Sequence, residues 1–144
     1  MAEFRRLSPD FAVAPQLTRE DVASAAADGF TTIISNRPED EAPGQPSDAD
    51  LIAAAQSVGI TFRSLPFRGP PPPAIVAETV LVIEQARGPI LAFCRSGNRS
   101  AAAWGMAQAL SGASTPDQII EAAAKAGYDL SPARDALECL APKR

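Results

Sequence analysis

Residues 89–110 read PILAFCRSGNRSAAAWGMAQAL and contain a predicted strand, a short loop and a predicted helix in direct succession. The apolar run Pro89–Phe93 predicts a buried strand, and the segment from Ser100 to Leu110 has the composition of a helix. A short loop that begins at Cys94 joins the two. A strand, a tight loop and a helix in this order direct backbone N–H groups and a helix amino terminus at one point, where an anion can bind.

The rest of the chain alternates predicted strands with predicted helices. This alternation with short connections predicts the α/β class, with a mostly parallel four- to five-stranded sheet flanked by helices and a helical cluster at the carboxyl end. Residues 1–144 are long enough for one domain. Loops 36–46 and 67–73 each follow a strand, so both should lie at the carboxyl edge of the sheet, where open α/β folds bind ligands. The other strands are predicted at 11–14, 31–35 and 60–66, and the other helices at 18–28, 47–58, 73–87, 116–126 and 132–140.

Composition restricts the chemistry that this chain can perform. Histidine is absent, which excludes a Ser-His-Asp triad, a Cys-His pair and a zinc site with histidine ligands. A formal net charge of −4 argues against nucleic acid and membrane surfaces as partners. We find no signal peptide and no membrane span, and the two cysteines, Cys94 and Cys139, fit a reducing cytoplasm. We expect no metal and no cofactor, and we expect Cys139 to be a buried core residue beside Leu137 and Leu140.

Cys94 is the predicted nucleophile. The dipole of the following helix, the N–H groups of the loop and Arg99 should lower the pKa of its thiol, and the hydroxyl of Ser100 is a further candidate donor. We therefore predict Cys94, Arg99 and Ser100 as catalytic residues. The residues between Cys94 and Arg99 form the predicted anion-binding loop, in which Gly97 permits a positive φ; they are Arg95, Ser96, Gly97 and Asn98.

The loop resembles two families of cysteine enzymes. CRSGNRS, with four residues between Cys94 and Arg99, looks like the active-site loop of rhodaneses, which transfer sulfane sulfur. Cysteine-dependent phosphatases place five residues there, so that their arginine would fall at Ser100, and their usual preceding histidine is replaced by Phe93. Residues 5–110, with NRPEDEAPGQPS before the loop, are similar to the beta-lactamase hydrolase-like, phosphatase-like domain family. This resemblance implies a dual-specificity-phosphatase-like fold, and some relatives are fused to metallo-hydrolase or persulfide dioxygenase modules.

Two features lead us to predict sulfur transfer first. The Cys–Arg spacing has the rhodanese length, and loop 67–73 lacks the carboxylic acid that a phosphatase uses to protonate its leaving group. The predicted enzyme moves sulfur from thiosulfate or a persulfide, through a Cys94 persulfide, to a thiol acceptor. Its partners would be a small anionic sulfur donor and a persulfide-handling enzyme.

Two alternatives remain at this point. The first is a phosphatase that acts on a phosphorylated substrate through a phosphocysteine, with an acid from the cluster Glu39–Glu41, in which Asp40 is the accessory candidate. The second is a non-catalytic persulfide carrier or anion-binding module. In each case Arg37 and Arg68, which follow strands closely, could add positive potential at the mouth of the site.

Overall fold

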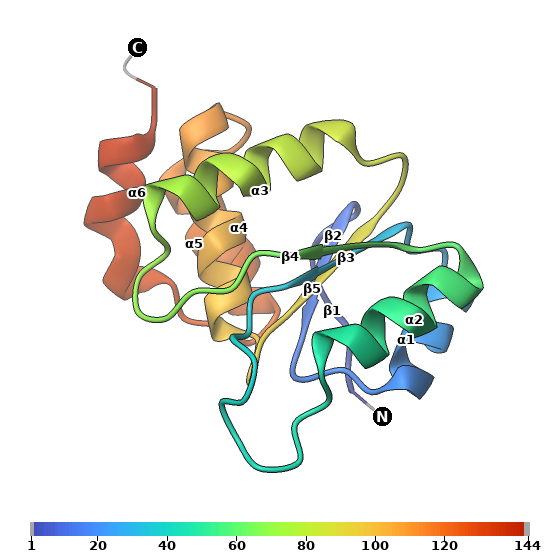
Figure 1. The fold of residues 1–144 in the computed structure, drawn as a ribbon. Coiled ribbons are helices and arrows are strands. Elements are labelled where there is room, and N and C mark those ends of the chain that lie inside the picture. Colours follow the sequence, from blue (N-terminus) through green and yellow to red (C-terminus); the bar gives the residue numbers. More distant parts are fainter. Residues whose placement is uncertain (1, 143–144) are drawn as a thin grey trace.

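The computed structural model describes residues 2–142 and contains one five-stranded sheet (Figure 1). The strand order is β1-β2-β5-β3-β4, in which β1 pairs antiparallel with β2 and every other pair is parallel. This confirms the predicted α/β class with a mostly parallel sheet. The strands are β1 (Arg5–Ser8), β2 (Phe11–Ala14), β3 (Thr32–Ser35), β4 (Thr61–Ser64) and β5 (Ile90–Phe93).

Helices cover both faces of the sheet (Figure 1). Two of them, α1 and α2, pack together on one face, and the remaining helices pack on the other. The bounds are α1 (Arg19–Ala27), α2 (Asp48–Val58), α3 (Pro73–Gln85), α4 (Asn98–Ser111), α5 (Pro116–Lys125), the 3-10 helix η1 (Ser131–Ala133) and α6 (Arg134–Leu140). None of the helices in this described part of the chain is long and apolar enough to cross a membrane.

The two faces have separate hydrophobic cores because side chains alternate along each strand. In β3, Ile33 faces the core under α1 and α2, while its neighbour Ile34 faces the core under α3, α4 and α5. In β5, Leu91 and Ala92 divide in the same way. All four residues of β5 are buried, since this strand lies in the middle of the sheet. The strand that leads into the cysteine loop is therefore fixed from both faces and both edges.

The carboxyl-terminal region differs from the prediction. The predicted helix 132–140 is divided into η1 and α6. Cys139 is exposed, so the prediction of a buried core cysteine is wrong. Leu137 is the buried residue of α6, and a residue two positions further along a helix lies about 200° around the axis, which turns Cys139 toward solvent.

Candidate active site

Cys94 directly follows β5, between the carboxyl ends of β2 and β3. Only 1% of the residue is exposed. The backbone N–H of Gly97 donates a hydrogen bond to Cys94 Sγ across 3.0 Å. Gly97 has a φ of +99°, a left-handed conformation in which a glycine avoids the steric cost of a side chain. The loop thus turns back on itself and directs an N–H at the sulfur.

The helix after the loop begins earlier than predicted. It starts at Asn98 rather than at Ser100, so Arg99 belongs to its first turn. The amino-terminal N–H groups of a helix have no partner within the helix and carry partial positive charge. Arg99 and this helix terminus together place positive potential beside Cys94.

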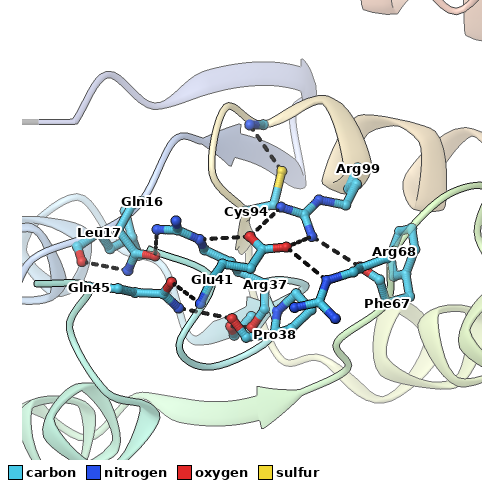
Figure 2. A network of polar contacts seen from close by, with 12 residues as sticks. Gln16, Leu17, Arg37, Pro38, Glu41, Gln45, Phe67, Arg68, Cys94 and Arg99 are labelled. Atoms are coloured by element: carbon cyan, nitrogen blue, oxygen red, sulfur yellow. Dashed lines mark hydrogen bonds and ion pairs between the residues drawn. The ribbon is translucent and has the colours of Figure 1, made fainter. Parts of the chain in front are cut away.

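Arg99 is held by Glu41, a residue from the loop between β3 and α2 (Figure 2). Its Nη1 and Nη2 atoms donate to the two carboxylate oxygens of Glu41, each across 2.8 Å, and Nη1 also donates to the carbonyl of Phe67 at 3.1 Å. The Cys94 side chain also faces this guanidinium and contributes to raising the pKa of Arg99. The bonds to Glu41 and Phe67 use three of the five N–H donors of Arg99, and the remaining two, on Nε and Nη2, have the fork geometry that suits an oxyanion.

Three arginines surround the Glu41 carboxylate (Figure 2). Besides Arg99, Arg37 Nε donates to it at 2.9 Å and Arg68 Nε at 3.4 Å. These contacts lower the pKa of Glu41 to about 2, with the hydrogen bond from Arg99 as the largest cause and partial burial acting in the opposite direction. The pKa of Arg99 is raised, first by Glu41 and further by the nearby charge of Cys94. Glu41 is consequently ionised at neutral pH and cannot serve there as a proton donor.

The other partners of this network fix the loops around Cys94. Arg37 is buried and its Nη1 donates to Gln16 Oε1 at 3.0 Å, and the backbone N–H of Gln16 donates to the carbonyl of Arg95 at 3.4 Å. Gln45 closes loop 36–46 through its own bonds to the Glu41 N–H and the Pro38 carbonyl. Four segments, after β2, β3, β4 and β5, are thus joined at one edge of the sheet.

Ser100 does not occupy the role predicted for it. Its hydroxyl donates to Asn36 Oδ1 at 2.8 Å, and Asn36 Nδ2 in turn donates to the carbonyl of Leu65 at 3.0 Å. All of these groups are buried. The hydroxyl proton is therefore directed at Asn36 and not at the Cys94 sulfur, and Ser100 ties α4 to the loop after β3.

The three residues predicted as accessory, Arg37, Asp40 and Arg68, have different environments in the structure. Asp40 is exposed and has a φ of +58°, the only positive value for a non-glycine residue in the described chain. The carboxylate that contacts Arg99 is that of its neighbour Glu41. Arg37 and Arg68 both contact Glu41. The spacing from Arg37 to Glu41 is a weak signal for this pair in the sequence, since an i, i+4 ion pair is expected only where the segment turns like a helix.

The remaining loop residues are placed as follows. Arg95, Ser96 and Asn98 are exposed, whereas Gly97 is buried. The hydroxyl oxygen of Ser96 accepts from the Asn98 N–H at 3.4 Å. The loop thus presents polar side chains outward while its backbone curls around Cys94.

A cysteine in the loop after a central parallel strand and an arginine in the first turn of the following helix, on a sheet of this order, define a protein of the cysteine phosphatase fold. A family model, the phosphatase-like domain of beta-lactamase hydrolase-like protein, matches residues 3–111. The chain belongs to this family.

Similar proteins agree with this assignment. The beta-lactamase hydrolase-like protein of Agrobacterium fabrum is 31% identical over 137 residues, which cover 92% of this chain and 31% of that protein. The chain therefore spans about a third of the length of this relative. A crystal structure of a candidate phosphatase from Neisseria meningitidis is 34% identical, with a TM-score of 0.81 over 94% of this chain and 96% of that one. The crystal structure of Tk-PTP in the active form has a TM-score of 0.72 at 16% identity and 95% coverage of both chains, and supports the fold alone.

These comparisons favour the phosphatase alternative. The family model and the Neisseria meningitidis structure carry phosphatase names, and neither supports the sulfur transfer that we predicted first.

Proposed function

We propose that this domain is a cysteine-dependent phosphatase, which hydrolyses a phosphate monoester through a phosphocysteine at Cys94. The observation that carries the proposal is the way Glu41 holds Arg99. Glu41 holds the Nη1–Nη2 end of the guanidinium, which leaves the Nε–H and one Nη2–H for a ligand beside Cys94. A planar fork next to a cysteine, with helix N–H groups beside it, is complementary to a phosphoryl group with several equatorial oxygens.

The reaction has two steps in this proposal. In the first, the Cys94 thiolate forms a bond to phosphorus while the bond from phosphorus to the ester oxygen breaks, and the leaving oxygen departs with the electron pair and takes up a proton. In the second, water attacks the phosphocysteine, the bond from sulfur to phosphorus breaks, and inorganic phosphate and the thiolate are released. Arg99, the loop N–H groups and the α4 terminus stabilise the charge on the phosphoryl oxygens in both steps.

The proton for the leaving oxygen would come from Asp40. Among the carboxylates of residues 39–41, Glu41 is held ionised, and Glu39 accepts a bond from the Asp48 N–H at 2.7 Å. Within residues 2–142, Asp40 makes no hydrogen bond or ion pair, and it is exposed in the loop that supplies Glu41. Its carboxyl can therefore exchange protons with solvent, and the proposal assigns to it the proton that the leaving oxygen takes up.

A paired assay on one purified sample tests the proposal. It measures the hydrolysis of an aryl phosphate beside the transfer of sulfur from thiosulfate to cyanide. We expect phosphate release that disappears in Cys94→Ser and persists in Cys139→Ser, a matched control because Cys139 is exposed on α6. Phosphate release that survives in Cys94→Ser, or is absent from the wild type, would contradict the proposal.

Sulfur transfer remains the second candidate because of one specific observation, the four residues between Cys94 and Arg99. In that reaction the thiolate bonds to the outer sulfur of thiosulfate, the sulfur–sulfur bond breaks, and sulfite leaves as an anion that needs no proton. Formation of thiocyanate that depends on Cys94, without phosphate release, is the result that would select it.

A further inference from the structure

Tyr128 is a buried tyrosine that approaches the cysteine loop from a distant part of the chain. It lies between α5 and η1, beyond residues 3–111 that match the family model. Only 6% of the residue is exposed. Its backbone N–H donates to the carbonyl of Ala123 at 2.8 Å, so the end of α5 fixes its position. The carboxyl-terminal region thereby places an aromatic side chain next to the candidate active site.

The tyrosine packs against the outer side of the loop. Its hydroxyl donates a long hydrogen bond, 3.5 Å, to the carbonyl of Ser96. A Cβ atom built on Gly97 would overlap this hydroxyl and would lie 2.9 Å from Cζ of the ring. The ring therefore fills the space on that side of Gly97, while the Gly97 N–H donates to Cys94 Sγ. One short peptide segment is held between the tyrosine and the nucleophile.

A second element secures the tyrosine. The guanidinium of Arg5, on β1, lies 5.7 Å from the centroid of the ring, and its Nη1 donates to the carbonyl of Ala126 at 3.2 Å. Burial raises the pKa of Tyr128, and the charge of Cys94 contributes further, so the phenol stays protonated and able to donate at neutral pH. Tyr128 and Arg5 together form a brace, which joins β1, the carboxyl-terminal helices and the cysteine loop.

We propose that Tyr128 is a positioning residue of the oxyanion cradle. By packing against Gly97 and bonding to the Ser96 carbonyl, it holds the loop in the curled form in which the Gly97 N–H donates to Cys94. The carboxyl-terminal cluster is then a working part of the active site and not only a cover for the sheet. The proposal deepens the proposed function, but it concerns the cradle and holds for any tetrahedral oxyanion.

Binding of tungstate, a tetrahedral oxyanion, tests the proposal without turnover. We would compare the wild type, Tyr128→Phe and Leu130→Ala by calorimetry. Tyr128→Phe keeps the ring and removes the hydroxyl, and loss of one net hydrogen bond predicts tungstate binding about 3- to 10-fold weaker. Leu130→Ala is the matched control, because Leu130 is equally buried in the same segment but packs on Gly105, further along α4. It should lower the melting temperature while tungstate affinity stays within about 2-fold of wild type, since Gly105 lies in the middle of α4 and not in the cysteine loop.

A second readout follows the nucleophile itself. The pH dependence of iodoacetamide alkylation of Cys94 would be measured in a Cys139→Ser background, because the exposed Cys139 would also react. We expect the Tyr128→Phe profile to move to higher pH and the Leu130→Ala profile to remain in place.

Several outcomes would overturn the proposal. The first is that Tyr128→Phe binds tungstate as tightly as the wild type and has an unchanged alkylation profile. The second is that Leu130→Ala loses as much tungstate affinity as Tyr128→Phe. The third is that the wild type binds no tungstate. One outcome separates this proposal from the proposed function. If Tyr128→Phe weakens tungstate binding but the wild type releases no phosphate, the positioning role stands and the phosphatase activity is rejected.

Discussion

Replacement of Glu41 by glutamine removes the charge at the centre of the arginine network. The pKa of Glu41 falls from 4.5 to about 2 on folding, which corresponds to about 3 kcal/mol in favour of the ionised carboxylate. Because 14% of the side chain is exposed and solvent screens the charges, we expect Glu41→Gln to cost about 2 kcal/mol at neutral pH. For a chain of this length the melting temperature should fall by roughly 6–8 °C.

Activity should suffer in the same variant. Arg99 loses its bidentate anchor, and a misplacement of such a group by about 1 Å can reduce kcat/KM by about 100-fold. Glu39→Gln is the matched control in the same loop, since an amide oxygen can still accept from the Asp48 N–H. It should change the free energy of unfolding by no more than about 0.5 kcal/mol.

Urea unfolding at several pH values tests the assigned cause. The pKa of Glu41 is lower in the folded state than in the unfolded state, so the carboxylate stabilises the fold fully above about pH 4.5 and this stabilisation is lost as the pH falls toward 2. The difference in free energy of unfolding between wild type and Glu41→Gln should be equal at pH 7 and pH 5 and should shrink below half by pH 3. A difference that stays constant over this range would refute the argument, because the loss would then come from packing and not from the charge.

Two further substitutions address the other residues of the site. If Asp40 supplies the proton, Asp40→Asn should reduce kcat for an alkyl phosphate by about 100-fold and kcat for an aryl phosphate with an acidic phenol much less. Equal losses for the two substrates in steady-state assays would reject that role. Ser100→Ala should cost about 1–3 kcal/mol in urea unfolding, because the buried Asn36 Oδ1 loses its donor, while the alkylation profile of Cys94 stays unchanged; a shifted profile would restore Ser100 as a stabiliser of the thiolate.

Much of the fold follows from local patterns in the sequence. The apolar run of β5 and the capping residues Thr18 and Ser47 marked elements whose limits agree with the structure to within one or two residues. The strand β1 was not predicted, because its sequence RRLS holds one buried residue, Leu7, and its pairing with β2 comes from tertiary structure. Edge strands of this kind leave little periodicity to detect.

The site was less predictable than the fold. Cys94 and Arg99 lie close together in the sequence, and the strand, loop and helix pattern marks them. Glu41 lies 58 residues before Arg99, and the sequence shows three adjacent acids without indicating which one turns inward. Ser100 was assigned to Cys94 because the two are near in sequence, but its buried partner is Asn36, 64 residues away. Contacts that join separate loops depend on the folded positions of those loops.

The number of residues between Cys94 and Arg99 led us first to sulfur transfer. This number affects the binding of an oxyanion less than Glu41 does, because Glu41 orients Arg99. Since α4 begins at Asn98, Arg99 lies in the first turn of the helix, and Glu41 and the Phe67 carbonyl hold its Nη1–Nη2 end. The edge offered to a ligand is therefore set from outside the loop, and one residue fewer between Cys94 and Arg99 does not remove it. If sulfur transfer were the reaction, a single positive charge near the persulfide would suffice and a bidentate clamp on Arg99 would add little. Loss of phosphate release in Glu41→Gln would therefore connect the clamp to the phosphoryl oxygens.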